Sequence, residues 1–391
     1  MTSYDYRCRM TDEELQSFWP GWHVVSFLGG GAYGSVFRIC HYDNRGVRTE
    51  SALKVIELTD SSAGRYTGSY MDCNNGCTVS PESAFGEIRT MELLKGAPNN
   101  VSIEDWYYRK YSDMRGPAKL YIRMELLTSF PGFLHKTGDR MRCGVQQDSV
   151  FLSISEVCRM GIDICAALDR CERNRIIHRD IKPANLFRDR FGNYKVGDFG
   201  IARQVDAFGA AYSMTGIGTI SYMAPEIYMG KPYDHTVDIY ALGLVLYQFL
   251  NNGRAPLMPD YPTALTADII NAANYKRLKG DKLRKIPHID RRLNKIILKA
   301  CAYRPGARYQ SAAEFRKALH DYLCSMAYEN DMMIVQSNNV GGIAGDRGYA
   351  QEGETTQYSF KTRKVFYEKP AGHAAFGLAD VLSGISAAFG V

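Results

Sequence analysis

The chain has 391 residues, of which 45% are hydrophobic and 23% charged, the balance of a globular protein with a substantial core. Its net charge is only +6 and no dense run of lysine and arginine occurs, so the composition does not indicate nucleic-acid binding. The ten cysteines form no Cys-x-x-Cys pair, which favours reduced thiols over metal ligands or a disulfide framework. No apolar signal segment opens the chain, and these features together predict a cytoplasmic protein.

The first third of the chain predicts a strand-rich unit that contains one helix. Ser80 and Pro81 are the residue types expected at the N-cap and first position of that helix. Residues 1–21 are expected to be an N-terminal extension outside this unit. Alternating apolar residues predict five strands, over residues 22–28, 35–40, 52–58, 103–108 and 120–124.

Beyond residue 125 the pattern predicts long helices. The most apolar run, residues 240–250, is about half as long as a membrane span needs to be and therefore predicts a buried core helix. From about Asn330 the chain becomes rich in glycine, threonine and polar residues, which indicates a tail outside the folded body. Apolar residues recur at three- and four-residue spacing over 155–174, 236–250, 266–279, 290–302 and 311–327.

A glycine-rich loop lies between the first two predicted strands, where residues 29–36 read GGGAYGSV and match G-x-G-x-x-G-x-V. Glycines let backbone amides approach phosphate oxygens that a Cβ atom would keep away. The match alone is weak, because a plain hairpin turn also uses glycine. No helix follows the loop and no Lys-Ser/Thr pair ends it, which excludes Rossmann and Walker loops.

A lysine on the third predicted strand, Lys54, would lie beside phosphates held by this loop. A buried lysine requires a carboxylate partner. Glu87 is the preferred partner because it shares a helix face with apolar residues, and Glu92 on the adjoining face is the alternative.

Two further motifs follow the first long helix of the second unit, HRDIKPAN at residues 178–185 and DFG at residues 198–200. Together they supply a carboxylate that can accept a hydroxyl proton, an amide and a carboxylate that can bind Mg²⁺, and a lysine that can stabilise a moving charge. Phosphoryl transfer requires these groups because its barrier falls mainly through positioning and charge neutralisation.

The ordered set of motifs resembles the protein kinases over residues 22–325, and residues 277–297 look like the bacterial, eukaryotic-type serine/threonine kinases. The resemblance implies an α+β, bilobal protein-kinase fold, with a small antiparallel β-sheet lobe containing one helix and a larger, mainly helical lobe. It divides the chain into a small lobe at 22–124, a hinge at 125–128, a large lobe at 129–325 and a largely disordered tail at 326–391. Insertions are expected at 59–79 and 135–150.

The same resemblance implies the transfer of the γ-phosphate of ATP to serine or threonine hydroxyls of protein substrates, with Mg²⁺ or Mn²⁺ as the metal. It assigns Asp180 as the catalytic base, Lys182 as the group beside the transferring phosphoryl, and Asn185 and Asp198 as metal ligands. Thr219 would bridge Asp180 and Lys182. The implied nucleotide site comprises Leu28, Gly29, Gly31, Gly34, Val36, Ala52, Lys54, Glu87, Met124, Glu125, Leu127 and Leu186, with Met124 as gatekeeper and residues 125–127 as hinge.

Three further positions in the large lobe take their expected roles from the family. Glu226, at the end of the Ala-Pro-Glu motif, should pair with Arg308 and anchor the lobe. Asp238 should hold the backbone of the catalytic loop. Ala184 and Gln248 stand where arginine-selecting kinases carry acidic residues, so substrates are not expected to need an upstream arginine cluster.

Two alternative functions remain at the level of the sequence. A nucleotide-binding pseudokinase would normally lack one of Lys54, Asp180, Asn185 or Asp198, and all four are present. A small-molecule kinase would lack the complete activation segment, which here extends from Asp198 to the Ala-Pro-Glu motif. Both alternatives rank well below a protein kinase.

The sequence also suggests regulation by phosphorylation. Ser213 and Thr215 are candidate autophosphorylation sites in the activation segment, where a phosphate could pair with Arg179 and Arg203. In the tail, Thr355 and Thr356 lie in an acidic segment suited to a phosphothreonine-reading partner. The chain ends in an apolar helical stripe formed by Leu378, Leu382, Ile385 and Phe389. This stripe could dock on the kinase, pair two chains or bind a membrane, and membrane binding ranks last because few basic residues lie nearby. The oligomeric state is not predicted.

Overall fold

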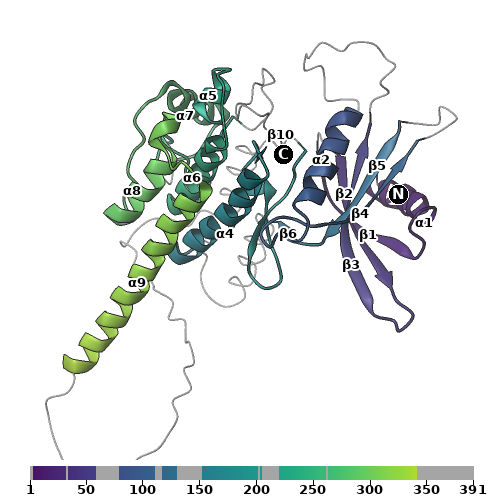
Figure 1. The fold of residues 1–391 in the computed structure, drawn as a ribbon, viewed down its shortest axis with the longest axis horizontal. Coiled ribbons are helices and arrows are strands. Elements are labelled where there is room, and N and C mark those ends of the chain that lie inside the picture. Colours follow the sequence, from purple (N-terminus) through teal and green to yellow (C-terminus); the bar gives the residue numbers. More distant parts are fainter. Residues whose placement is uncertain are drawn as a thin grey trace, which may run out of the picture.

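The computed structural model describes residues 3–31, 34–58, 79–110, 117–129, 152–200, 203–204, 220–260 and 263–340. A five-stranded antiparallel sheet with strand order β1-β2-β3-β5-β4 forms the small lobe, and a mainly helical part forms the large lobe (Figure 1). The expected α+β, bilobal fold is confirmed. The strands of the small-lobe sheet are β1 (Trp22–Gly31), β2 (Gly34–Tyr42), β3 (Arg48–Glu57), β4 (Ile103–Arg109) and β5 (Lys119–Glu125).

Helix α2 (Pro81–Leu93) crosses the small lobe beside this sheet, as Figure 1 shows. Its N-cap is Ser80, whose side chain accepts a hydrogen bond from the amide of Ser83. The buried residues of the helix lie on one face and comprise Ala84, Glu87, Ile88 and Met91. A carboxylate therefore sits in the middle of an apolar face, where it requires a cationic partner.

The N-terminal residues contain a helix, α1 (Ser3–Gln16), where the sequence analysis expected only an extension. Leu15 of α1 is fully buried with Phe37 and Leu53 in a core cluster on the sheet. Glu14 accepts hydrogen bonds from Lys119 and Tyr121 of β5, at 2.8 and 2.6 Å. The helix was missed because its apolar residues are few, and contacts with the sheet rather than its own periodicity stabilise it.

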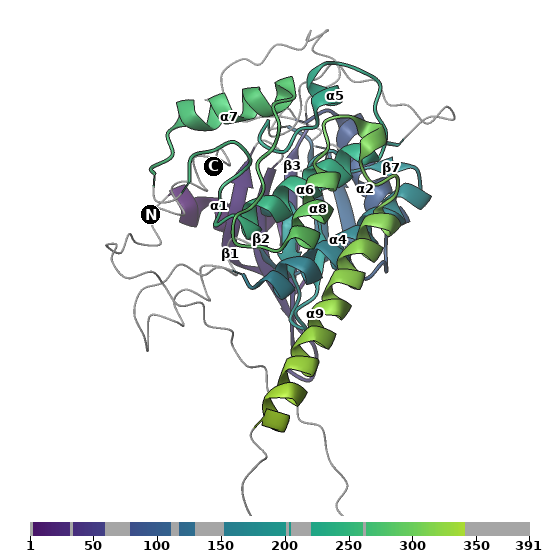
Figure 2. The ribbon, with the colours of Figure 1, turned by 90° about the vertical axis from the view of Figure 1, so that its left-hand side faces the viewer.

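The large lobe is built around α6, which is buried along nearly its whole length. A helix that is apolar on every side belongs in a core, so the expectation for residues 240–250 is confirmed. Helix α9 runs diagonally across α4 and α8 in Figure 2. The helices of this lobe are α4 (Ile154–Arg173), α5 (Pro225–Tyr228), α6 (Thr236–Leu250), α7 (Ala267–Lys279), α8 (Arg291–Ala300) and α9 (Ala312–Val340).

Helix α9 continues to Val340, past the expected helix end at residue 327 and into the stretch from Asn330 that was expected to be tail. The polar composition of that stretch does not prevent helix formation, because asparagine and glutamine carry only a modest helix penalty. Most of the tail lies outside the described residues, together with the stripe and the two threonines expected there.

Short strands carry the functional loops of the large lobe. Strands β8 and β9 form a hairpin that turns at Gly192, which has a positive φ of 93°. The carboxylate of Asp189 accepts hydrogen bonds from the amides of Phe191 and Asn193 and holds this turn. The short strands are β6 (Thr128–Ser129), β7 (Ile176–Ile177), β8 (Leu186–Arg188), β9 (Tyr194–Val196) and β10 (Arg203–Gln204).

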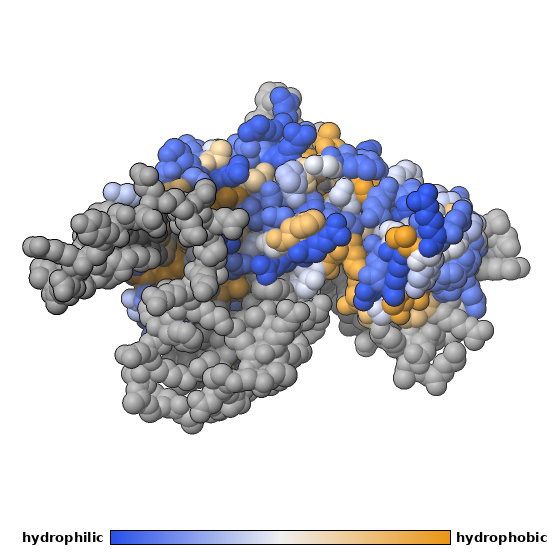
Figure 3. All heavy atoms as spheres, turned by 90° about the horizontal axis from the view of Figure 1, so that it is seen from below, coloured by the Kyte–Doolittle hydropathy of each residue, from blue (hydrophilic) through white to orange (hydrophobic). Residues whose placement is uncertain are grey.

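The face seen in Figure 3 is mostly hydrophilic, and the apolar residues that are coloured there form small separate patches. Among the described residues, no helix combines the length and the apolar character needed to cross a bilayer.

Candidate active site

Three charged side chains from different elements meet where the two lobes join. Lys54 extends from β3, Glu87 from α2, and Asp198 follows β9 of the large lobe. The ammonium of Lys54 lies 2.7 Å from Oε1 of Glu87 and 2.9 Å from Oδ1 of Asp198. The expected pairing of Lys54 with Glu87 is therefore present, and the alternative partner Glu92 forms its ion pair with Lys95 instead.

The charges in this cluster are set by burial and by mutual attraction. Burial alone would lower the pKa of Lys54, but the carboxylates of Asp198 and Glu87 outweigh it and raise that pKa. Burial also opposes ionisation of Asp198, yet the Lys54 ammonium prevails and lowers the Asp198 pKa. For Glu87, which is almost inaccessible, burial is the dominant effect and raises the pKa. Asp198 is thus the carboxylate that stays ionised most readily.

The glycine-rich loop closes the β1–β2 hairpin, in which Gly31 pairs with Gly34. Gly34 has a φ of 121°, and a Cβ atom built there would lie 2.3 Å from the carbonyl oxygen of Val55. This position requires glycine both for its backbone conformation and for its contact with β3. At Gly29, in contrast, an added Cβ would meet nothing within 4 Å.

The expected catalytic-loop residues form one hydrogen-bonded group. Lys182 Nζ lies 2.9 Å from Oδ2 of Asp180, and the side-chain amide of Asn185 donates to the same oxygen at 2.9 Å. Asn185 also donates to the backbone oxygen of Asp180 at 2.9 Å, which closes the loop on itself. One carboxylate oxygen is thereby held by two donors. This arrangement fixes the direction in which Asp180 faces.

Asp238, at the start of α6, holds the backbone of this loop as expected. Its two carboxylate oxygens accept hydrogen bonds from the amides of His178 and Arg179, both at 2.8 Å. Burial raises the pKa of Asp238 although both amides favour its ionised form. Arg179 has a φ of 67°, a conformation that non-glycine residues seldom adopt and that often marks functional sites.

His178 connects the catalytic loop with the Asp-Phe-Gly turn. Its Nε2 lies 3.2 Å from the carbonyl oxygen of Gly197, and its ring packs against Phe199 with centroids 4.8 Å apart. Asp198 also has a positive φ, of 62°. Ser83 of α2 donates to the carbonyl oxygen of Gly200 at 3.3 Å. The turn is therefore attached to both lobes.

The residues expected around the adenine base lie on β1, β2, β3 and β8. Ala52 and Leu186 are buried, Val36 is half-buried, and Leu28 is 50% exposed. Ala52 pairs with Met124 across the β3–β5 ladder, which places the expected gatekeeper beside β3.

A salt bridge at the expected hinge was missed by the sequence analysis. Lys195 of β9 lies 2.7 and 2.8 Å from the two carboxylate oxygens of Glu125, and Glu125 also accepts from the amide of Ser102. Leu127 packs against the main core. The contact joins the hinge to the strand that leads into Asp198, and no local signal in the sequence relates residues so far apart.

Two buried arginines hold the segment that follows the activation loop. Arg308 forms a bidentate ion pair with Glu226, at 2.6 and 2.8 Å, as expected. Arg277 of α7 donates to the backbone oxygens of Ile220 and Met223, both at 2.7 Å. The role of Arg277 was not anticipated, because in the sequence it stands between Lys276 and Lys279, which are exposed, and resembles another surface cation.

Several expected residues cannot be placed. Thr219, Ser213 and Thr215 and most of the two insertions lie outside the described residues, as does the side chain of Arg203. The guanidinium of Arg179 donates a hydrogen bond to the hydroxyl of Tyr233 at 3.2 Å.

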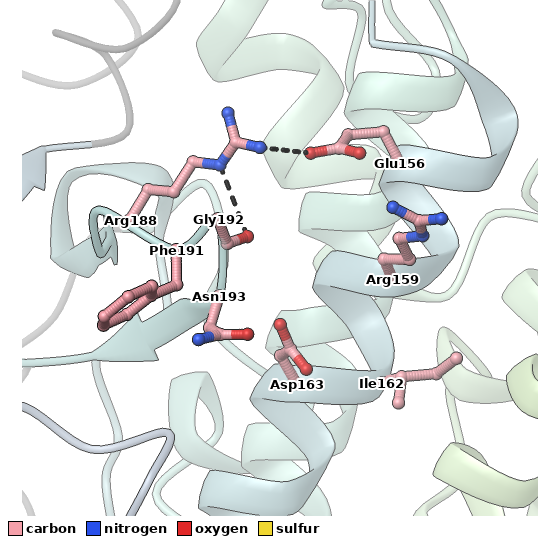
Figure 4. A pocket seen from close by; sticks show the side chains of 8 residues that line it. All are labelled: Glu156, Arg159, Ile162, Asp163, Arg188, Phe191, Gly192 and Asn193. Carbon is pink, nitrogen blue, oxygen red and sulfur yellow. Dashed lines mark hydrogen bonds and ion pairs between the residues drawn. The ribbon is translucent and has the colours of Figure 1, made fainter. Parts of the chain in front are cut away.

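A pocket of about 250 Å³ lies apart from these residues, between α4 and the β8–β9 hairpin (Figure 4). Arg188 lies 3.3 Å from Glu156 and donates from Nε to the carbonyl oxygen of Gly192, so its guanidinium closes one side. None of the lining residues was expected in the active site. They are Glu156, Arg159, Ile162, Asp163, Arg188, Phe191, Gly192 and Asn193.

The comparison with known protein families agrees with this geometry. Residues 22–322 match the protein kinase domain family. The chain belongs to the protein kinase family. The matched residues include the sheet of the small lobe, the helices α4 to α8 of the large lobe and the motifs described above.

Similar curated proteins come from mycobacteria and corynebacteria, which confirms the expected likeness to bacterial kinases. The serine/threonine-protein kinase PknB of Mycolicibacterium smegmatis is 38% identical over 162 residues, 40% of this chain and 24% of that protein. PknB of Mycobacterium tuberculosis (strain ATCC 25618 / H37Rv) is 37% identical over 165 residues, again 40% and 24%. The probable PknB of Corynebacterium glutamicum is 35% identical over 211 residues, 52% and 30%. The matches thus span less than a third of these relatives.

Proposed function

We propose that this kinase transfers the γ-phosphate of ATP to serine and threonine hydroxyls of proteins. The observation that carries the proposal is the 2.9 Å contact between Lys54 and Asp198 across the two lobes. A pseudokinase tends to lack one of four residues, and all four are present here. They are Lys54, Asp180, Asn185 and Asp198. The names of the bacterial relatives favour serine and threonine as acceptors.

Asp180 is the group that would receive the proton of the attacking hydroxyl. Its Oδ2 is occupied by Lys182 and Asn185, so Oδ1 is the oxygen left to face a substrate. Lys182 lies beside the same carboxylate and is placed to compensate negative charge on the phosphoryl group as it moves. Positioning of this kind accounts for most of the catalysis in phosphoryl transfer.

Asp198 and Asn185 offer the oxygen donors that Mg²⁺ prefers. The side chain of Asp198 is 29% exposed and its pKa is lowered, so it is accessible and ionised. A bound Mg²⁺ would neutralise charge on the β- and γ-phosphates of ATP. Lys54 is poised to hold the α- and β-phosphates, and Glu87 fixes the direction of its ammonium.

The test is transfer of labelled γ-phosphate from ATP to a generic protein substrate, followed by phosphoamino-acid analysis. We expect phosphoserine and phosphothreonine with the wild type and neither with Asp180→Asn. Nucleotide binding without transfer would identify a pseudokinase. Transfer to aminoglycoside or choline substrates but never to protein would identify a small-molecule kinase.

Autophosphorylation of the activation segment is a second part of the proposal. Thr215 lies four residues before Thr219, and Arg179 belongs to the catalytic loop that Asp238 holds. A phosphate on Thr215 or Ser213 would give Arg179 a stronger partner than the hydroxyl of Tyr233. Mass spectrometry of active enzyme that finds both positions unmodified would contradict this part.

Substrate selection and partner binding complete the proposal. Gln248 is buried and accepts from the hydroxyl of Tyr222 at 2.6 Å, so it offers no charge to a substrate arginine. A peptide library should therefore show no dominant selection for arginine before the acceptor.

Phosphorylation of Thr355 or Thr356 would create a docking site for a phosphothreonine-reading partner. The test is capture of the kinase by such a domain, before and after removal of the tail.

A further inference from the structure

The end of the large lobe away from the small lobe carries a concentrated positive charge, where α7 and α8 lie (Figure 1). Residues 276–304 contain eleven lysine and arginine residues and two aspartates, a net charge of +9 in a chain whose total is +6. The remainder of the chain therefore has a net charge of −3. Ten of these cations are exposed and are called here the basic surface: Lys276, Lys279, Lys282, Arg284, Lys285, Arg291, Arg292, Lys295, Lys299 and Arg304.

The charge of this surface is not compensated by the rest of the described chain. None of the ten cations forms an ion pair with another residue that the structure places. Of the two aspartates, Asp290 is engaged as the N-cap of α8, where it accepts from the amides of Arg292 and Leu293, and it also accepts from the hydroxyl of Tyr322. Asp281 is the other acidic residue of the segment, and it too is exposed.

In helix α8 the exposed cations lie close enough together to repel one another. Arg291, Lys295 and Lys299 follow one another at intervals of four residues and are all exposed, while Leu293 and Ile297 face the core. Like charges at this spacing are neighbours on a helix and destabilise it. A stripe of cations that weakens its own helix, with no acidic residue placed against it, indicates a partner that supplies negative charge.

We propose that the basic surface docks an acidic segment of the protein substrates, an inference that rests on the proposed protein kinase activity. The first reason is its connection with the acceptor site. Arg277 lies between two residues of the surface, Lys276 and Lys279, and its buried guanidinium holds the carbonyl oxygens of Ile220 and Met223. These carbonyls belong to the segment directly after Thr219, the residue expected to bridge Asp180 and Lys182, so α7 is attached to the backbone that follows that position.

The second reason is the spacing of the charges. Residues four apart on α8 are displaced by about 6 Å along the helix axis. In an extended peptide, alternate side chains on one side are about 6.6 Å apart. An acidic peptide lying along α8 can therefore place successive carboxylates beside Arg291, Lys295 and Lys299.

A membrane surface fits less well, because lipid binding gains from exposed apolar residues that enter the bilayer. Between residues 263 and 304 the exposed large apolar side chains are Tyr275 and Tyr303. Lys279 lies over the Tyr275 ring at 5.3 Å, and Tyr303 lies against Gly280. Both rings are thus already in contact with the protein, and charge is the main feature that the surface offers.

The experiment compares two acceptor peptides that share one phosphorylation site and a flexible linker and differ only in an extension of glutamates or of glutamines. We expect the glutamate extension to lower KM about tenfold, the effect of a few exposed charge pairs, and to leave kcat unchanged. The triple variant Arg291→Glu, Lys295→Glu, Lys299→Glu should lose this advantage and should phosphorylate the glutamine peptide normally.

A matched control changes the same number of exposed cations elsewhere, Arg45→Glu, Lys110→Glu, Arg170→Glu, and should keep the advantage. If the control variant loses as much of the KM advantage as the α8 variant does, the advantage depends on net charge and not on the basic surface, and the inference is wrong. Equal KM values for the two peptides with wild-type enzyme would overturn docking but not kinase activity, whereas no phosphorylation of either peptide would overturn the proposed function itself. Without a KM advantage, binding of anionic phospholipid vesicles or single-stranded RNA that the α8 variant abolishes would reassign the surface to lipid or RNA.

Discussion

Arg308 and Glu226 face each other inside the large lobe, joined by two hydrogen bonds of 2.6 and 2.8 Å although 82 residues separate them in the sequence. The Arg308 side chain is completely buried, and its remaining donors bind the carbonyl oxygens of Ala302, Thr236 and Tyr303. The pair attaches the end of the activation segment to the loop before α9. Both charges are fully engaged, so removal of one leaves the other buried without a partner.

Arg308→Met is therefore expected to lower the free energy of unfolding by about 3–5 kcal/mol. Urea denaturation of the purified domain measures this change. Lys317→Met is the control, because Lys317 pairs with Asp321 at 2.6 Å on the exposed surface of α9, where such pairs contribute about 0.3–0.5 kcal/mol. If both variants lost the same free energy of unfolding, the buried pair would contribute no more to stability than the exposed pair.

Asp180→Asn is expected to reduce the rate of phosphoryl transfer by a factor on the order of 10²–10⁴ while the fold persists, since the amide cannot accept the hydroxyl proton. Single-turnover kinetics together with denaturation curves would separate chemistry from stability. Asp281→Asn, at an exposed position of the same lobe, should leave the rate unchanged. Retention of more than about a tenth of the wild-type rate by Asp180→Asn would mean that another residue is the base.

Glu87 should make the stability of the small lobe depend on pH. Because burial raises the pKa of Glu87 in the folded state, the folded protein binds this proton more tightly than the unfolded chain does. The free energy of unfolding of the wild type, relative to Glu87→Gln, should therefore fall as pH rises from about 4.3 through the folded pKa. Urea denaturation at a series of pH values tests this, with exposed Glu82→Gln expected to follow the wild type. A difference that rises with pH would contradict the direction of the shift.

Gly34→Ala should disturb the glycine-rich loop, because the added methyl group would meet the Val55 carbonyl oxygen at 2.3 Å and the backbone has a positive φ. We expect a loss of stability greater than about 1 kcal/mol and a higher KM for ATP. Gly29→Ala, whose methyl group meets nothing within 4 Å, should keep its stability within about 0.5 kcal/mol of the wild type. Similar stabilities for both variants would argue against the contact with β3.

Helix α1 should be an integral part of the small lobe. Leu15→Ala removes a fully buried side chain and is expected to cost about 2–5 kcal/mol of unfolding free energy. Glu13→Ala changes an exposed residue of the same helix and should cost less than about 0.5 kcal/mol. If Leu15→Ala is as mild as Glu13→Ala, α1 is not packed on the sheet in solution.

The sequence alone determined the class of fold and the identity of the chemical groups. Strand alternation over β1 to β5, helical spacing in α4, α6, α7 and α8 and the cap at Ser80 are local properties, so they are readable without tertiary structure. The glycine-rich, HRD and DFG motifs were recognisable because phosphoryl transfer needs particular residue types at short, fixed spacing.

Tertiary structure alone decided which distant residues meet. Helix α1 has little amphipathic pattern and is held by Leu15 and Glu14 on a sheet formed by later residues. Lys195 reaches Glu125 only because β9 passes the hinge. The cations of the basic surface form no long run in the sequence, and only the packing of α7 and α8 shows that ten of them are exposed and without acidic partners among the placed residues. For α1 and for the Lys195–Glu125 pair the deciding interaction joins residues far apart in the chain, where local propensity carries no information.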